Sequence, residues 1–365
     1  MKLTTAGESH GKTLVGIIEG LPSNLPIDID FVNNCLALRQ SGYGRGGRQK
    51  IESDKIEILS GVRNRLTLGS PLAFQIVNRD YVNWQPYMAP EGADVSQKRL
   101  TKVRPGHADL TGVIKYDQTD ARNILERASA RETAVRVAAG AIAMCYLREL
   151  GVQISGYVKC VCGVEDKAFY PFERLAEAKE QPLFMLDGEL QKKAMQLIDE
   201  LRVAGDTAGG IVEIRVKGLK SGFGSCMQYT TKLDAILCGA LMSVQAIKGV
   251  EVGMGFGVAY KPGSLVHDEI YLKDGAYVRT TNNAGGIEGG MSNGGEIVLL
   301  KGLNTVDISS GQPAKAASER SDVAAICACE IIAECVTATA LAEVVSARLG
   351  GDNLREVKER YSRLP

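Results

Sequence analysis

The sequence predicts an α+β fold, in which strand segments come before and after a buried, alanine-rich helix along the chain. Apolar runs typical of strands occur at 14–18, 55–60, 72–78, 152–161 and 211–216. A helix, a Gly-Val pair and a strand follow one another at 123–158 and again at 232–258, which indicates two related helix-and-sheet halves. The chain is long enough to bury a sizeable core, and we expect one catalytic domain over residues 1–365.

The stretch 104–140 organises the rest of the chain. It begins with a charged turn around His107 and continues into an alanine-rich helix, which we expect to start at Arg127 and to end near Gly151. Arginine has five fixed donors suited to phosphate and carboxylate, and a helix start adds free N–H groups. The stretch therefore predicts an anion site, although a surface helix with solvated arginines would have a similar pattern.

Composition excludes several function classes. Lys plus Arg equals Asp plus Glu at 43 each, so no overall field favours nucleic acid or a membrane. The nine cysteines include no C-x-x-C pair, so we predict no metal site and a reducing compartment. The first residues lack the pattern of a signal peptide, and no long uncharged apolar run occurs. We expect a cytoplasmic protein.

The first polar loop, residues 7–13, reads GESHGKT and precedes the strand at 14–18. It is one residue too short between its glycines for a P-loop, whose N–H groups must curl around a phosphate. His10 in this loop is a candidate catalytic acid. Considered alone, it is better explained as a turn histidine that bonds locally.

The next two segments predict a short helix at 28–40 and a basic loop at 39–48. Glycines separate Arg39, Arg45 and Arg48, which gives a loop that could close over an anion, or less plausibly bind RNA. Residues 80–103, with the only tryptophan, Trp84, read as a long irregular segment of the kind that forms a lid.

The second half of the chain predicts three helices and a glycine-rich loop. The helices are expected at about 187–204, 232–248 and 320–349, with a strand at 252–258 and a glycine loop at 281–295. Asp322 would lie in the first turn of the last helix, where a dipole contact is the simplest explanation. His267 lies in a polar turn and reads as structural. No nicotinamide-binding fingerprint occurs.

Together these motifs resemble the chorismate synthase family over nearly the whole chain. The matching motifs are GESHG at 7–11, RQSGYGRGGR at 39–48, RPGHAD at 104–109, SARETAVRVAAGA at 129–141, VQAIKGVEVG at 244–253, AGGIEGGMSNG at 284–294 and RSD at 320–322. Seven motifs in one order are far more specific than any single one. The resemblance implies a β-α-β sandwich assembled as a homotetramer.

The resemblance also implies an activity and its residues. The activity is the anti-1,4-elimination of phosphate from 5-enolpyruvylshikimate 3-phosphate, in the shikimate pathway, with reduced flavin mononucleotide (FMN) bound beside the substrate. The catalytic residues would be His10, His107 and Asp322, with His10 giving a proton towards the departing phosphate. The substrate-binding residues would be Arg39, Arg45, Arg48, Arg104 and Ser129. The cofactor-binding residues would be Arg127, Ala128, Ser129, Gln245, Ala246, Gly289 and Arg320.

The chain departs from the family pattern in two places. Ile124, Leu125 and Glu126 stand where the family has glycines, and Ala128 replaces a serine. About ten residues of an expected flavin loop are absent near 300–303. Either the chain lacks that loop or the sequence omits it, and the retention of the catalytic residues favours omission. If residues are missing, we expect the structure to be flavin-free.

Two other functions compete with this one. A non-catalytic anion-binding or RNA-binding scaffold would be indifferent to loss of His10 or His107. A flavin oxidoreductase would transfer electrons to its substrate, whereas the lyase reaction is redox-neutral overall. NADPH would be needed only if the protein reduced its own flavin, and the missing fingerprint favours a separate reductase.

Overall fold

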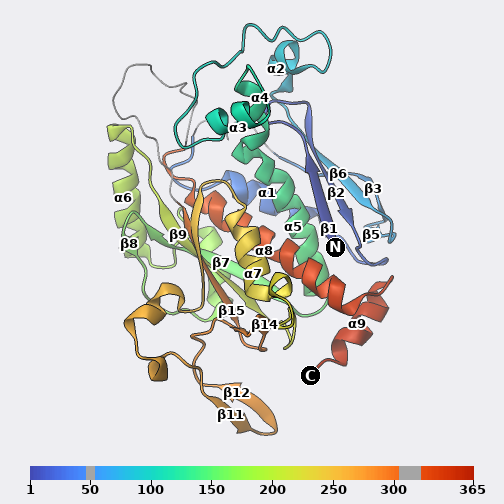
Figure 1. Cartoon of the computed structure of the whole chain (residues 1–365), viewed down its shortest axis with the longest axis vertical. Helices are drawn as coiled ribbons and strands as arrows, with labels where there is room; N and C mark the ends of the chain where they lie inside the picture. Colours follow the sequence, from blue (N-terminus) through green and yellow to red (C-terminus); the bar gives the residue numbers. More distant parts are fainter. Residues whose placement is uncertain (47–53, 304–321) are drawn as a thin grey trace.

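The computed structural model describes residues 1–46, 54–303 and 322–365. Its strands form two antiparallel sheets that face each other across a layer of helices (Figure 1). The four-stranded sheet has the order β1 (Lys2–Ala6), β2 (Thr13–Glu19), β6 (Leu72–Val77) and β3 (Glu57–Ser60). The five-stranded sheet has the order β10 (Ile247–Val252), β15 (Ile297–Leu303), β9 (Gly210–Lys217), β7 (Gln153–Val161) and β8 (Val164–Glu165).

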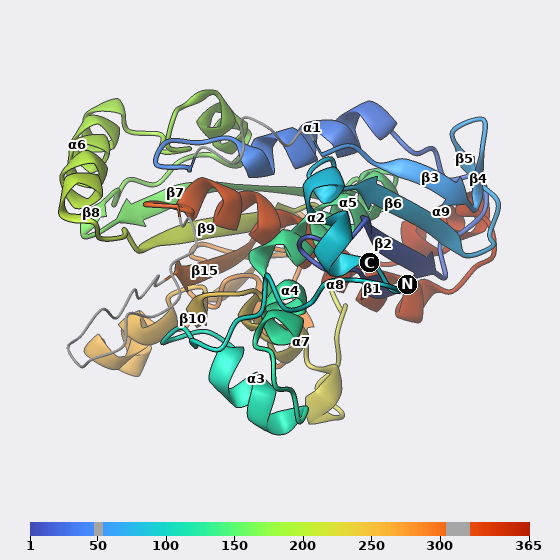
Figure 2. The same cartoon turned by 90° about the horizontal axis from the view of Figure 1, so that it is seen from above.

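Three helices form the middle layer. They are α1 (Ile29–Gln40), α5 (Thr133–Arg148) and α8 (Ile326–Leu349). Helix α5 packs on β2 of the smaller sheet, α8 packs on β7 and β9 of the larger one, and the two helices pack on each other (Figure 2). Both are apolar around nearly their whole circumference, which is typical of a helix buried on all sides. The predicted α+β sandwich is therefore confirmed.

The remaining elements lie around this sandwich. The outer helices are α2 (Tyr81–Met88), α3 (Asp109–Lys115), α4 (Arg122–Ala128), α6 (Gly188–Ala204), α7 (Leu233–Met242) and α9 (Leu354–Ser362). Three short hairpins pair β4 (Val62–Arg63) with β5 (Leu66–Thr67), β11 (Ile270–Lys273) with β12 (Ala276–Arg279), and β13 (Ile287–Glu288) with β14 (Met291–Ser292). Helices α2, α3 and α4 gather beyond the start of α5, at the opposite end of the molecule from the β11–β12 hairpin (Figure 1).

The central helix is shorter than the sequence suggested. The prediction of a helix from Arg127 was wrong because the chain breaks at Ser129, whose backbone is extended (ψ 143°). The Ser129 hydroxyl then accepts the backbone N–H of Arg131 and caps a 3-10 turn, Ala130–Glu132, from which α5 starts at Thr133. The break separates α4 from α5.

Three further boundaries differ from the prediction. Residues 80–103 are not irregular throughout, because α2 spans Tyr81–Met88. Helix α7 ends at Met242 instead of 248, and a positive φ of 64° at Ala246 turns the chain into β10. That strand ends at Val252, before Gly253 (φ 59°), so the strand predicted over 252–258 does not continue past Val252.

The start of the last helix also needs correction. Helix α8 starts at Ile326, so Asp322 precedes the helix instead of lying in its first turn. The strands of the two helix, Gly-Val, strand units are β7 and β10, and both belong to the five-stranded sheet. Residues 300–303, where a flavin loop was expected to begin, complete strand β15, and the following residues lie outside the described range.

Gly140 lets α5 and α8 approach closely, and this leads to a stability prediction. A Cβ on Gly140 would lie 2.2 Å from the carbonyl oxygen of Cys335 and 2.4 Å from its Cβ. We expect Gly140→Ala to lower the free energy of unfolding by about 1–3 kcal/mol, because two buried backbones would have to separate. Urea unfolding measures the loss. The control is Gly239→Ala in α7, where a Cβ meets nothing within 4 Å, and stability should stay level or rise by about 0.5–1 kcal/mol.

None of the helices in the described residues combines the length and the apolar run that a bilayer crossing requires.

Candidate active site

His10 is held by Glu126, from the last turns of α4. The imidazole Nδ1 lies 2.8 Å from Glu126 Oε1, and the backbone N–H of His10 donates to Oε2 at 2.7 Å. The backbone N–H of Ser9 donates to the Glu126 carbonyl at 2.9 Å. Both side chains are buried, with 5% of His10 and 2% of Glu126 exposed. Two segments 116 residues apart are thus joined through main chain and side chain.

Trp84 covers one face of the His10 ring. The two rings stack with centroids 3.8 Å apart. The indole N–H donates to Asp80 at 3.0 Å, which holds the tryptophan on α2. The cations of Lys98 and Arg122 lie 5.2 Å and 5.1 Å from the indole ring centre. The predicted lid segment therefore contributes a helix that packs on the candidate acid.

Ser129 connects the His10 loop to the start of α5. Its hydroxyl lies 3.2 Å from that of Ser9 and accepts the backbone N–H of Arg131 at 3.3 Å. Arg127 donates to backbone carbonyls of the first strand and its loop, at Thr5 (3.1 Å) and Gly7 (3.2 Å). Arg127 and its neighbour Ala128 form the end of α4.

Two arginines share one buried carboxylate, Asp54. Arg131 binds it with both terminal nitrogens, at 2.8 Å and 2.9 Å, and Arg39 binds it at 3.0 Å. Burial acts to raise the pKa of Asp54, but the charges of Arg131 and Arg39 outweigh burial and hold that pKa below its usual range. Burial lowers the pKa of Arg39, opposed by Asp54. The bidentate contact fixes the guanidinium plane of Arg131.

Arg45 and Asp322 form the next link in this network. The guanidinium of Arg45 lies 2.6 Å from the Asp322 carboxylate, which also accepts the backbone N–H of Gly46 at 2.7 Å. Arg45 donates to the carbonyl of Arg39 at 3.4 Å. One chain of contacts thus runs from His10, through the residues around Ser129 and Asp54, to Asp322.

Arg104 and His107 lie on a separate turn before α3. Arg104 binds Asp109 in bidentate fashion at 2.8 Å and 2.9 Å, and Asp109 is buried. His107 is exposed, and its Nδ1 donates to the Pro105 carbonyl at 2.9 Å, which leaves Nε2 towards solvent. Arg48 and Arg320 lie outside the described residues.

Three of the residues predicted for a flavin, Gln245, Ala246 and Gly289, fall at the two ends of α7. Gly289 and Gly290 lie beside the start of the helix, where the Gly290 carbonyl accepts the N–H of Leu233. Gln245 follows its end, about 15 Å away for a ten-residue helix. Ala246 has a positive φ of 64°, which is rare for a residue with a Cβ. The structure therefore does not bring Gly289 to Gln245 within one chain.

Three buried residues in this region were missed by sequence reasoning. They are Glu126, Asp54 and Lys301. Glu126 was noted only as a departure from glycine, and Asp54 falls between predicted elements with no motif around it. Lys301 is fully buried, and its ammonium has no hydrogen-bond partner in the described part of the chain. The one available indication for Lys301 was a lysine inside an apolar run.

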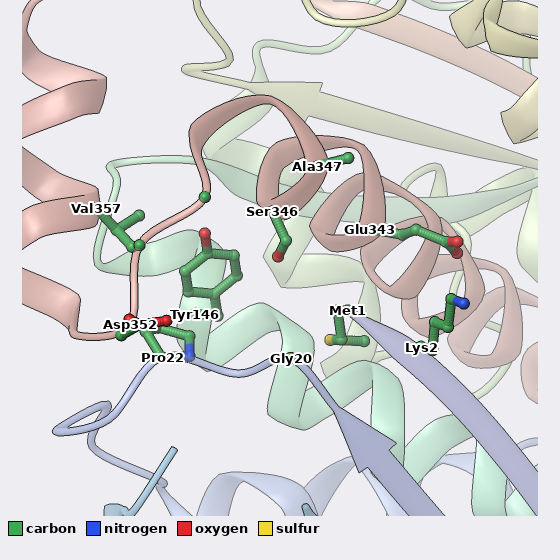
Figure 3. Close-up of a pocket in the computed structure, with 12 residues that line it drawn as sticks. Met1, Lys2, Gly20, Pro22, Tyr146, Glu343, Ser346, Ala347, Asp352 and Val357 are labelled. Carbon is green, nitrogen blue, oxygen red and sulfur yellow. The ribbon is translucent and has the colours of Figure 1, made fainter. Parts of the chain in front are cut away.

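One cavity lies away from these residues. It measures about 350 Å³ and is lined by the first residues of the chain, the ends of α5 and α8 and the segment before α9, including Met1, Tyr146, Ser346 and Asp352 (Figure 3). Tyr146 lies thirteen residues along α5 from Thr133, which is roughly 20 Å. None of the predicted site residues lines it.

Comparisons with known proteins agree with the fold and the motifs. The family model described as chorismate synthase matches residues 1–345. Chorismate synthase of Alkaliphilus metalliredigens (strain QYMF) is 49% identical, covering 99% of this chain and 98% of that protein. The protein of the same name from Geobacter sulfurreducens is 48% identical, covering 99% of this chain and 97% of that protein. A crystal structure of chorismate synthase matches with a TM-score of 0.81 and 36% identity, covering 99% of this chain and 96% of that one.

The protein has a layer of helices between two sheets, with a buried histidine–carboxylate pair and arginines at one end. This arrangement is that of a β-α-β sandwich enzyme, and the relatives identify the enzyme as a lyase. The chain belongs to the chorismate synthase family. The alignment with the Alkaliphilus protein spans 372 positions, more than the 365 residues of this chain, so it contains gaps on this chain's side.

Proposed function

We propose that the protein converts 5-enolpyruvylshikimate 3-phosphate to chorismate and phosphate by anti-1,4-elimination with reduced FMN. In this reaction the bond from ring carbon to phosphate oxygen breaks, a ring proton leaves, and a new ring double bond forms. Family membership supports the activity. The observation that carries the site is the buried His10–Glu126 pair, which presents an acid beside a cluster of arginines.

His10 would give its proton to the departing phosphate. Glu126 is a carboxylate and can only accept hydrogen bonds, so the proton on Nδ1 points to Glu126 and Nε2 is the atom that can serve the substrate. Arg39 and Arg45 would bind the anionic groups of the substrate, exchanging part of their contact with Asp54 and Asp322 for it. Asp322 would assist in removing the ring proton.

The side chains predicted to bind the cofactor include groups that can form hydrogen bonds with a flavin. Gln245 has a buried side-chain oxygen without a hydrogen-bond partner among the described residues, which suits the N–H of a flavin ring. Arg127 and Ser129 lie at the α4–α5 break, and Arg136 of α5 donates to Ser243 near Gln245. Reduced FMN, when bound, would supply electron density that helps the phosphate leave, which makes the unactivated ring hydrogen easier to remove. His107 would hold a proton close to it.

The proposal extends to assembly and location. We propose a homotetramer in the cytoplasm, on the resemblance to the family alone. NADPH enters the proposal only if the protein reduces its own flavin. Size-exclusion chromatography with light scattering tests the tetramer.

An anaerobic assay tests the function. The protein is mixed with 5-enolpyruvylshikimate 3-phosphate and chemically reduced FMN, and chorismate and phosphate are followed together. Release of both without net oxidation of flavin is expected. Electron transfer to the substrate would instead indicate an oxidoreductase. No product together with no flavin binding would indicate that this chain has lost its cofactor site.

His107→Ala is expected to reduce turnover far more than substrate affinity. His107 is exposed and holds only one local contact, so its loss leaves the fold intact. As a proton carrier it would act in the transition state, and its removal should lower kcat by about 10²-fold or more at nearly constant KM. Steady-state kinetics with reduced FMN measures both constants. An equal change in kcat and KM would contradict the assigned role.

A further inference from the structure

Glu126 contacts both the backbone and the ring of His10 with its carboxylate. Its two oxygens accept both the backbone N–H and the Nδ1 proton of His10, and Oε1 also accepts Arg122 at 3.0 Å. Arg122 precedes Glu126 by one helical turn, so α4 itself presents the pair. Burial acts to raise the pKa of Glu126, but the hydrogen bonds and charge of His10, with help from Arg122, hold that pKa below its usual range.

An ionised Glu126 determines how His10 can act. A carboxylate accepts but does not donate, so Nδ1 must carry a proton and Nε2 becomes the exchanging atom. The ring of Trp84 stacks on the imidazole with centroids 3.8 Å apart and covers one of its two faces. The ring is therefore held in one plane, one tautomer and one orientation, as a histidine that transfers protons requires.

We propose that Glu126 is the positioning residue for His10, fixing Nε2 as the atom that donates to the departing phosphate and balancing the charge of the protonated ring. The inference rests on the proposed function of His10. In the step itself the Nε2–H bond breaks, an O–H bond forms on the phosphate, and the ring becomes neutral. Glu126 stays ionised throughout and touches neither substrate nor cofactor.

Trp84 makes the pair measurable without substrate or flavin. It is the only tryptophan of the chain and stacks on His10, and a protonated imidazole quenches indole emission. The charged groups around the pair are Glu126 and Arg122 on α4, and Asp80 and Lys98 beside the indole. Of these, Glu126 alone is hydrogen-bonded to the imidazole, so its charge should dominate the titration seen in Trp84 emission.

The test compares Glu126→Gln with wild type in two measurements. In the first measurement, Trp84 fluorescence is followed from pH 5 to 9. We expect the midpoint of its transition to lie about one pH unit lower in Glu126→Gln than in wild type, because the neutral amide no longer stabilises the imidazolium. In steady-state kinetics we expect kcat to fall about 10–100-fold with KM within about threefold, the size of effect seen when a partner that orients a histidine is lost. Glu189→Gln, which removes an exposed ion pair with Lys192 on α6, should change neither.

Further variants separate the possible failures. Glu126→Asp keeps the charge and should return the fluorescence transition towards the wild-type pH, even if Gln at this position impairs folding. His10→Ala should abolish the transition, and the double variant should lose no more kcat than His10→Ala alone. An unmoved transition and wild-type kcat in Glu126→Gln would overturn the inference. If His10→Ala itself kept full turnover, the proposed role of His10 would fail instead, whatever the fluorescence showed.

Discussion

Replacing His10 by alanine is expected to lower kcat by about 10²–10⁴-fold, the range that a positioned proton donor contributes. The departing phosphate would then leave as a more highly charged anion, stabilised by arginines alone. KM should change little, because only 6% of the His10 side chain is exposed and the ring gives a substrate only the Nε2 edge. Anaerobic steady-state kinetics with reduced FMN measures both constants.

His267 provides the matched control for that experiment. It is exposed in a polar turn, and His267→Ala should leave kcat within about twofold of wild type. Circular dichroism must show that His10→Ala is folded, because the buried Glu126 loses the imidazole and keeps Arg122 as a side-chain partner. Wild-type turnover in a folded His10→Ala protein would refute the proton-donor role and favour the turn-histidine interpretation.

The elements with regular patterns could be predicted from the sequence, because periodicity and capping are local properties. The helix at 28–40 is an example, since Asp28 accepts the N–H of Phe31 and begins α1 one residue later. The break at Ser129 could not be predicted, because good helix formers such as Leu125 and Glu126 before it and the alanine-rich stretch after it favour a continuous helix. What decides the break is the hydroxyl of Ser129, which takes the N–H of Arg131 and faces Ser9 from a distant part of the chain.

In the site too, some residues could be predicted from the sequence and others could not. His10 and Asp322 could be named from motifs, and the structure links them through one network of contacts. Glu126 and Asp54 could not, because each acts through partners far away in sequence: 116 residues for His10 and 77 for Arg131. A carboxylate in a single sequence carries no mark of the cation that will face it after folding. Arg39 and Arg45 could be predicted from their motif, but not Asp54, which binds both Arg39 and Arg131.

Asp54→Asn is expected to destabilise the protein by about 3–5 kcal/mol, the cost of breaking a buried ion pair from one side. Asp54 is 4% exposed and neutralises both Arg39 and Arg131, which are 6% and 7% exposed. An asparagine would remove the negative charge of Asp54 from between the two buried guanidinium groups. Urea unfolding at pH 7 measures the loss. Asp30→Asn, at an exposed pair with Arg65, should cost less than about 0.5 kcal/mol.

The pH dependence of this loss identifies its cause. The pKa of Asp54 is lower in the folded protein than its ordinary value of 3.8, so its contribution is fully present above that value and disappears as pH falls below it. The stability difference between wild type and Asp54→Asn should therefore be constant from about pH 5 to 7 and shrink below about pH 4. Glu126 and Asp109 also have lowered pKa values, but both proteins retain them, so their effect cancels in the difference. A difference that persisted unchanged at pH 3 would mean that the shape of the carboxyl group, and not its charge, holds Arg39 and Arg131 in place.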